Sequence, residues 1–220
     1  MKKLLLLDLD NTLFRSTELR TEIYKKIGFL LRNSTNSKEH IIALCNSIGK
    51  AMIDNLGYFS PDIFISNLGQ KIDISGKEKT IKDIIFDTEF SKSFMYEEVL
   101  PVLKAMQNNI ELAIFSQGER AFQKSKLSAI THLFNEKKIH FEKDKKSEME
   151  KVFENYKDYQ IFYVDDRMGM LEAAKKLRSD VVAILMQRSP FVGEKTTEFT
   201  PDAIIRKLNE VVAIVEDRKG

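Results

Sequence analysis

Short apolar runs alternate with amphipathic stretches at the start of the chain and throughout its second half. Unbroken apolar runs are typical of strands that are buried on both faces of a sheet. The strands predicted in this way cover residues 4–7, 112–115, 161–164 and 181–186, with a weaker strand at 138–141 and a short edge strand at 203–205. The helices predicted between and after them cover residues 98–107, 119–134, 146–156, 171–177 and 206–216. Residues 189–200 are expected to form a loop.

Residues 15–92 have a different pattern, with apolar positions at helical spacing and no strand alternation. Asn36, followed three residues later by Glu39, resembles a capping box at the start of a helix. Ser60 and Pro61 supply the cap and the first-position proline of the next helix. We therefore expect an insertion that contains only helices.

The order of these elements predicts the fold class. Strands that alternate with helices form parallel sheets, because parallel neighbours need crossover connections, and these connections are right-handed. The pattern therefore predicts an α/β protein whose core is a Rossmann-like, doubly wound parallel sheet. We expect this core domain to comprise residues 1–14 and 93–220, and the all-helical insertion to comprise residues 15–92.

Composition and charge restrict the possible partners. The chain has 220 residues and a net charge of +2, which is too small for the basic surface of a nucleic-acid-binding protein. The apolar run at residues 4–7 is too short for a secretion signal, and no stretch approaches the length of a membrane span. We expect a cytoplasmic protein, a monomer or a homodimer, that binds neither nucleic acid nor membranes.

Polar side chains follow three of the predicted strands at the point where each strand ends. Asp8 and Asp10 follow the first strand, Ser116 follows the second, and Asp165 and Asp166 follow the strand at 161–164. In a parallel sheet these ends lie at one edge, where open α/β sheets bind ligands. Four carboxylates there would repel one another and raise one another's pKa unless a hard cation neutralised them. Oxygen ligands suit Mg²⁺, which binds carboxylates together with substrate phosphate. The sequence therefore predicts Mg²⁺ as cofactor and a phosphate ester as ligand.

The segment Asp8-Leu9-Asp10-Asn11-Thr12 resembles the first motif of the haloacid dehalogenase superfamily. The resemblance implies that Asp8 is the nucleophile and Asp10 the general acid/base, and that Asp8 and Asp10 also hold the metal. It covers the whole chain outside the insertion, which lies where that family carries a helical cap. The residues matched to the later motifs are Ser116 for the second, a phosphate-binding hydroxyl, and Asp165 and Asp166 for the fourth, which binds metal. Thr12 is assigned to phosphate binding with Ser116.

The third motif of the family is a lysine ahead of the fourth motif, and three lysines compete for this role. They are Lys143, Lys145 and Lys146. Lys146 precedes Ser147-Glu148 at an expected helix start, and we assign it as the phosphate-binding lysine.

The chain departs from the family pattern at two positions. Gln117 stands where many relatives have Asn, so the phosphate contact falls to Gln117 or to backbone N–H groups near Gly118. Met170 stands where many relatives have another acid of the fourth motif, which leaves the metal to the pair Asp165-Asp166.

These residues favour a Mg²⁺-dependent phosphatase that hydrolyses a small phosphorylated metabolite through an aspartyl-phosphate. Two alternatives stay open. A phosphosugar mutase would use the same residues and return the phosphoryl group to the substrate. A relative without catalytic activity, which binds phosphate or protein, would keep the fold alone.

Overall fold

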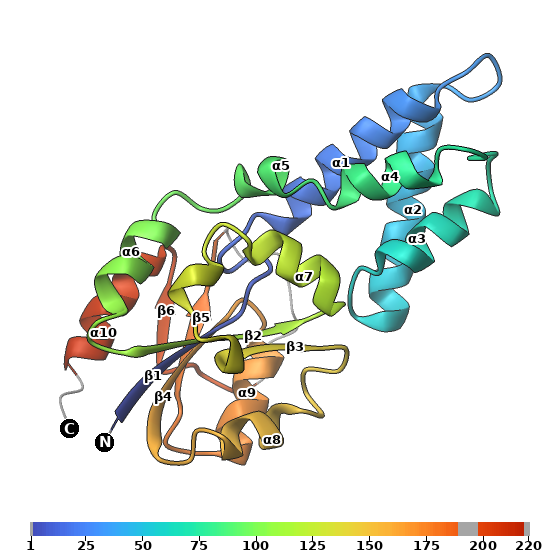
Figure 1. Ribbon diagram of the computed structural model, residues 1–220. Coiled ribbons are helices and arrows are strands. Elements are labelled where there is room, and N and C mark those ends of the chain that lie inside the picture. Colours follow the sequence, from blue (N-terminus) through green and yellow to red (C-terminus); the bar gives the residue numbers. More distant parts are fainter. Residues whose placement is uncertain (1, 189–197, 218–220) are drawn as a thin grey trace. The chain divides into compact units, whose positions relative to one another are not determined.

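The computed structural model describes residues 2–188 and 198–217 (Figure 1). The expected loop at 189–200 lies mostly outside these described residues. The chain divides into two compact units. We call them the α/β unit, with described residues 2–15, 95–116, 130–188 and 198–217, and the helical unit, with residues 16–94 and 117–129.

The α/β unit is built on one six-stranded sheet with the strand order β3-β2-β1-β4-β5-β6. Its strands are β1 (Lys2–Leu7), β2 (Glu111–Gln117), β3 (Ile139–Glu142), β4 (Tyr159–Asp165), β5 (Val182–Met186) and β6 (Ala203–Ile205). β1 pairs in parallel with β2 and β4, and β5 pairs in parallel with β4 and β6. All six predicted strands are present, and the predicted Rossmann-like α/β fold is confirmed.

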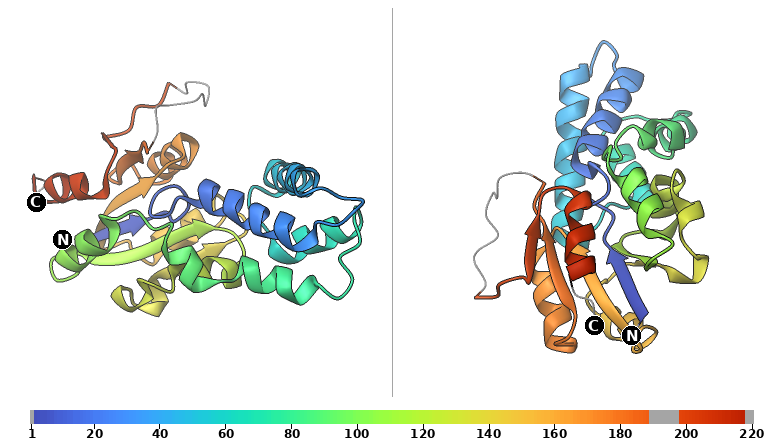
Figure 2. Two further views of the ribbon diagram at one scale, coloured as in Figure 1. Left: turned by 90° about the horizontal axis from the view of Figure 1, so that it is seen from above. Right: turned by 90° about the vertical axis from the view of Figure 1, so that its left-hand side faces the viewer.

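Helices flank this sheet because its strands are apolar toward both faces. Leu4 to Leu7 are all fully buried, so alternate leucines of β1 need cover on opposite sides. The helices of the unit are α6 (Val99–Met106), α8 (Met149–Glu154), α9 (Met168–Leu177) and α10 (Val211–Asp217), with 3-10 turns η1 (Thr131–Leu133), η2 (Glu136–Lys138) and η3 (Leu208–Glu210). α8 and α9 supply the helical part of the core cluster that includes Leu4, Leu6 and Tyr163. Figure 2 gives two further views of these elements.

The helical unit contains the expected insertion and has a core of its own. Its helices are α1 (Ser16–Leu31), α2 (Lys38–Leu56), α3 (Pro61–Gly69), α4 (Glu78–Ile85), α5 (Thr88–Lys92) and α7 (Arg120–Leu127). The predicted cap at Asn36 lies one residue too early, because Ser37 accepts the hydrogen bond from the His40 amide at 3.2 Å. Ser60 caps α3 as predicted, with Pro61 in the first turn. α2 ends at Gly57, whose φ of 78° is in the left-handed region that favours glycine.

Residues 117–129 group with the helical unit, whereas the sequence assigned them to the core domain. The physical reason is Phe122 of α7, whose ring centroid lies 5.4 Å from that of Phe59 and 5.9 Å from that of Phe86. The helix predicted at 119–134 therefore ends at Leu127, and the following residues form η1. Within the part of the chain that the structure describes, no helix is long and apolar enough to cross a membrane.

Candidate active site

The carboxyl ends of three adjacent strands bring the predicted site residues of the α/β unit together. Leu7 of β1 is in register with Ile114 of β2 and with Val164 of β4. Asp8 therefore follows the central strand, with Asp165 at the end of one neighbour and Ser116 near the end of the other. The predicted meeting of these three strand ends at one edge of the sheet is confirmed.

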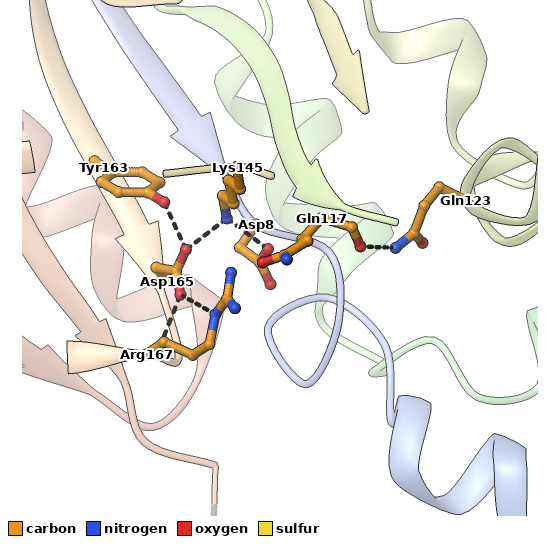
Figure 3. Close-up of polar contacts among 7 residues, drawn as sticks. All are labelled: Asp8, Gln117, Gln123, Lys145, Tyr163, Asp165 and Arg167. Atoms are coloured by element: carbon orange, nitrogen blue, oxygen red, sulfur yellow. Dashed lines mark hydrogen bonds and ion pairs between the residues drawn. The ribbon is translucent and has the colours of Figure 1, made fainter. Parts of the chain in front are cut away.

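Lys145 lies between two of these carboxylates, and Figure 3 shows its side chain pointing at both. Its Nζ lies 2.7 Å from Asp8 Oδ1 and 2.6 Å from Asp165 Oδ2, and its side chain is fully buried. Lys146 is exposed. The choice of Lys146 among the three lysines is therefore wrong, because the turn that precedes α8 directs Lys145 toward the carboxylates.

Further hydrogen bonds fix Asp165. Its Oδ2 also accepts a hydrogen bond from the Tyr163 hydroxyl at 2.6 Å, and its Oδ1 accepts one from the Arg167 amide at 2.8 Å (Figure 3). Arg167 Nε lies 3.8 Å from the same Oδ1. Sequence reasoning missed Tyr163 and Arg167. A signal for Tyr163 was present, because a hydroxyl two residues before Asp165 on a strand shares its face.

Burial and mutual repulsion act against ionisation of the aspartates at this site. Burial raises the pKa of Asp8 to about 6, with a further increase from the charge of Asp165 and a decrease from Lys145. Burial, with the charges of Asp8 and Asp165, also holds the pKa of Asp166 well above its ordinary value. Burial opposes ionisation of Asp165 too, but Lys145 and Arg167 hold its pKa below the ordinary value. A further positive charge at this site would therefore stabilise the ionised forms of Asp8 and Asp166.

A divalent cation fits this donor set. Asp8, Asp165 and Asp166 each offer an oxygen atom, and these atoms all lie within 4.8 Å of one another. Since both Asp165 oxygens already accept hydrogen bonds, Asp8 Oδ2 and Asp166 offer the more accessible ligand atoms. Carboxylate oxygens suit Mg²⁺ or another hard cation.

Two buried hydroxyls near the strand ends have no hydrogen-bond partner among the described residues. They are Thr12 Oγ1 and Ser116 Oγ, on residues with no exposed surface. Thr12 lies in the turn that follows Asp10. In this turn Asn11 has a φ of 55°, in the left-handed region. Buried hydroxyls are normally satisfied. These two are therefore available to a ligand with acceptor oxygens.

Gln117 groups with the helical unit rather than with the carboxylates, and its role in phosphate binding stays a prediction. Its carbonyl oxygen accepts a hydrogen bond from Gln123 Nε2 at 2.5 Å (Figure 3). A Cβ atom at Gly118, where φ is 144°, would lie 2.6 Å from that same Nε2, so this contact depends on a glycine. In the α/β unit, Met170 is part of the apolar core around α9, which explains why no acid stands there.

The family model of haloacid dehalogenase-like hydrolases matches residues 2–178 of the chain. No curated protein matches at a significant level. A protein from Burkholderia xenovorans, assigned as a haloacid dehalogenase-like hydrolase, has a similar structure with a TM-score of 0.75, 19% identity and coverage of 96% of this chain and 97% of the other. A HAD phosphatase from Thermococcus onnurineus has a TM-score of 0.64, 18% identity and 98% coverage of each chain. A protein from Thermotoga maritima, assigned as a β-phosphoglucomutase, has a TM-score of 0.66, 14% identity and coverage of 98% of this chain and 99% of the other. Since the family model covers most of the chain, and since the carboxylates and the lysine meet at the edge of a Rossmann-like sheet, the chain belongs to the haloacid dehalogenase-like hydrolases.

Proposed function

We propose that the protein is a Mg²⁺-dependent phosphatase that hydrolyses a small phosphomonoester through an aspartyl-phosphate on Asp8. The observation that carries this proposal is the buried ion pair of Lys145 with Asp8 and Asp165. Lys145 favours the ionised form of Asp8, which is the form that attacks phosphorus. The same ammonium group can also attract the oxygens of an incoming phosphoryl group.

In this proposal the neighbouring residues divide the remaining work. Thr12 Oγ1 and Ser116 Oγ donate hydrogen bonds to phosphoryl oxygens, which their lack of a protein partner among the described residues supports. Asp10 protonates the leaving alkoxide and later removes a proton from the attacking water. Its charge is close enough to raise the pKa of Asp8. Gln117 is proposed as a further phosphate contact.

The metal is proposed to be held by Asp8, the Asp10 carbonyl, Asp165 and Asp166. Asp166 is favoured over Asp165, because both Asp165 oxygens already accept hydrogen bonds. The four carboxyl groups outnumber the two nearby cations, Lys145 and Arg167, so ionisation of the carboxyl groups leaves negative charge in excess. Mg²⁺ would offset this excess and so favour the approach of a phosphate dianion. A metal ligand set made only of oxygen atoms agrees with this ion.

A phosphosugar mutase stays the alternative, since the same residues would carry out the phosphoryl transfer. The structural likeness to the Thermotoga maritima protein extends to the fold alone, as does the likeness to the Thermococcus onnurineus phosphatase. The two functions differ in the acceptor of the phosphoryl group, which is water in one and a sugar hydroxyl in the other. They are therefore separated by product analysis.

The test is to incubate the purified protein with p-nitrophenyl phosphate, nucleoside monophosphates and sugar phosphates, with Mg²⁺ or with EDTA. We expect phosphate release that needs Mg²⁺ and that falls at least about 10³-fold in Asp8→Asn, because an amide is a very poor nucleophile. Phosphorus NMR of the sugar phosphates follows isomerisation. Isomerisation without phosphate release would favour the mutase, and neither reaction with any compound would favour a binding protein.

A further inference from the structure

Arg188, two residues after the end of β5, makes its contacts with backbone and side chains far away in the sequence. Its Nη2 and Nε donate to the Thr12 carbonyl oxygen at 2.6 and 3.2 Å. Its Nη1 donates to the Glu98 carboxylate and, at 3.1 Å, to the Arg206 carbonyl oxygen. Only 10% of its side chain is exposed. No sequence motif singles out Arg188.

The surroundings of Arg188 hold its guanidinium rigidly. The Cζ atom lies 3.7 Å from the centre of the Tyr96 ring, which is a stacking distance. Glu98 Oε1 accepts a second hydrogen bond, from the Leu208 amide at 3.2 Å. Burial opposes ionisation of Glu98, but the hydrogen bond from Arg188 helps to hold its pKa below the ordinary value. A planar guanidinium held in this way can in turn fix the position of the Thr12 carbonyl, to which it donates two hydrogen bonds.

The Thr12 carbonyl belongs to the turn that carries Asp10. Within this turn, the Leu13 and Phe14 amides donate to the Leu9 carbonyl oxygen at 3.0 and 3.1 Å. The Leu13 carbonyl oxygen in turn accepts a hydrogen bond from the Tyr96 amide at 3.1 Å. Thr12 has its carbonyl held by Arg188 and its hydroxyl buried. A movement of the Thr12 peptide would therefore rotate the turn and displace Asp10.

We propose that Arg188 is a positioning residue, which sets the place of Asp10 through the Thr12 carbonyl. The inference rests on the proposed function, in which Asp10 is the general acid/base. Arg188 contacts no reacting atom, so its effect on the reaction depends on how much the step needs Asp10. An alkoxide needs a proton in order to leave, whereas p-nitrophenolate leaves without one.

The chain offers a matched control in Arg178. Its Nη1 and Nη2 donate to the Tyr156 and Tyr159 carbonyl oxygens at 2.8 and 2.5 Å, and its Nε donates to Asp180 at 2.8 Å. It thus joins backbone carbonyls to a carboxylate, as Arg188 does. Tyr159 is in register with Lys2, so this arginine lies at the opposite, amino edge of the sheet. Arg178→Lys should therefore lose comparable contacts without affecting Asp10.

The experiment compares kcat/KM for an alkyl phosphate with kcat/KM for p-nitrophenyl phosphate at saturating Mg²⁺. Lysine keeps the charge opposite Glu98 but cannot hold the Thr12 carbonyl with two N–H groups. In Arg188→Lys we expect the ratio of alkyl to p-nitrophenyl activity to fall about 10- to 100-fold. In Arg178→Lys the ratio should stay within about twofold of wild type. Tyr96→Leu removes the aromatic ring that lies against the guanidinium and should shift the ratio in the same direction, which keeps the test available if Arg188→Lys folds poorly.

Hydrogen exchange of the Leu13 and Phe14 amides supplies a readout that does not need turnover. We expect these amides to exchange at least about tenfold faster in Arg188→Lys and at the wild-type rate in Arg178→Lys. Unchanged exchange, or an equal loss of both activities in a folded Arg188→Lys protein, would overturn the inference and leave the proposed function standing. Faster exchange in a protein whose wild type hydrolyses no phosphate ester would overturn the proposed function and with it the catalytic part of the inference.

Discussion

The side chain of Lys145 has no exposed surface, and two carboxylates lie within hydrogen-bond distance of its amino group. A buried ammonium group is costly unless it is paired in this way. Its place could have been predicted from spacing. Lys145, Met149 and Phe153 lie four residues apart and are all buried, so they share one face of the turn and helix. Lys146 is one position off that face and is exposed. The expected helix start favours Lys146, whereas the spacing of the buried positions favours Lys145.

The neighbouring lysines give a matched test of this assignment. Lys145→Met leaves Asp8 and Asp165 buried without their cation, and we expect a loss of about 3–5 kcal/mol in the free energy of unfolding. Phosphatase activity should fall below detection as well. Lys146→Met changes an exposed charge and should alter stability by less than about 0.5 kcal/mol. Urea unfolding with both variants provides the measurement. Equal effects of the two substitutions would contradict the role of Lys145.

Asp10 gives a prediction about the order of chemical steps. In Asp10→Asn, formation of the aspartyl-phosphate from p-nitrophenyl phosphate should partly survive, because the leaving group needs no proton. Formation from an alkyl phosphate should be lost. Since Asp10 is also proposed to activate water, the intermediate should persist longer. Stopped-flow measurement would detect an initial burst of p-nitrophenol followed by a slow steady state. If burst and steady state fell together for both leaving groups, Asp10 would not be the general acid/base.

At the scale of elements, the sequence predicted strands better than helix ends. The four inner strands, β2, β1, β4 and β5, are mainly apolar and buried and are bounded by polar residues, so their places follow from the hydrophobic pattern alone. The segment 117–129 did not follow, because Phe122 and Leu127 are apolar residues that fit either unit in the linear pattern. Its assignment depends on contacts with Phe59 and Phe86, which are distant in the sequence. Similarly, Arg188 is an ordinary surface residue by sequence, whereas in the fold only 10% of its side chain is exposed.

The packing of α1 against α2 depends on a glycine, which gives a prediction at this scale. A Cβ atom at Gly49 of α2 would lie 2.0 Å from the Tyr24 hydroxyl oxygen of α1. Gly49→Ala should therefore destabilise the protein by about 1–3 kcal/mol through overpacking. Gly169→Ala in α9 is the control, since a Cβ atom there meets nothing within 4 Å. Alanine in a helix is favoured by about 0.5–1 kcal/mol, so this variant should be slightly more stable. Thermal unfolding of both variants decides the point, and an unchanged midpoint for Gly49→Ala would contradict the close approach.

For the whole molecule, the crowded carboxylates link stability to pH. The pKa of Asp8 is raised to about 6 in the folded protein, and that of Asp166 is raised too. The folded metal-free protein therefore binds more protons than the unfolded chain in the range between the ordinary carboxyl pKa and the raised one. Its stability then falls as pH rises through that range. Asp165, with its lowered pKa, acts in the opposite sense, but only at pH values below the ordinary one. Between pH 4 and 6 the shift of Asp8 from 3.8 to about 6 corresponds to about 3 kcal/mol.

Mg²⁺ and protons should therefore compete for the same carboxylates. At pH 8, which is above the raised pKa of Asp8, the Asp8 carboxylate is ionised, and Mg²⁺ at 100 times its dissociation constant should stabilise the fold by about 2.7 kcal/mol. For a chain of this size, this raises the unfolding midpoint by about 5–10 °C. At pH 5 the protons already occupy the site, so the same Mg²⁺ concentration should raise the midpoint much less. Calorimetry at both pH values, with Mg²⁺ or EDTA, measures the difference, and Asp166→Asn should reduce the Mg²⁺ effect at pH 8. A midpoint that responds equally at pH 5 and pH 8 would mean that the ion binds elsewhere than at these carboxylates.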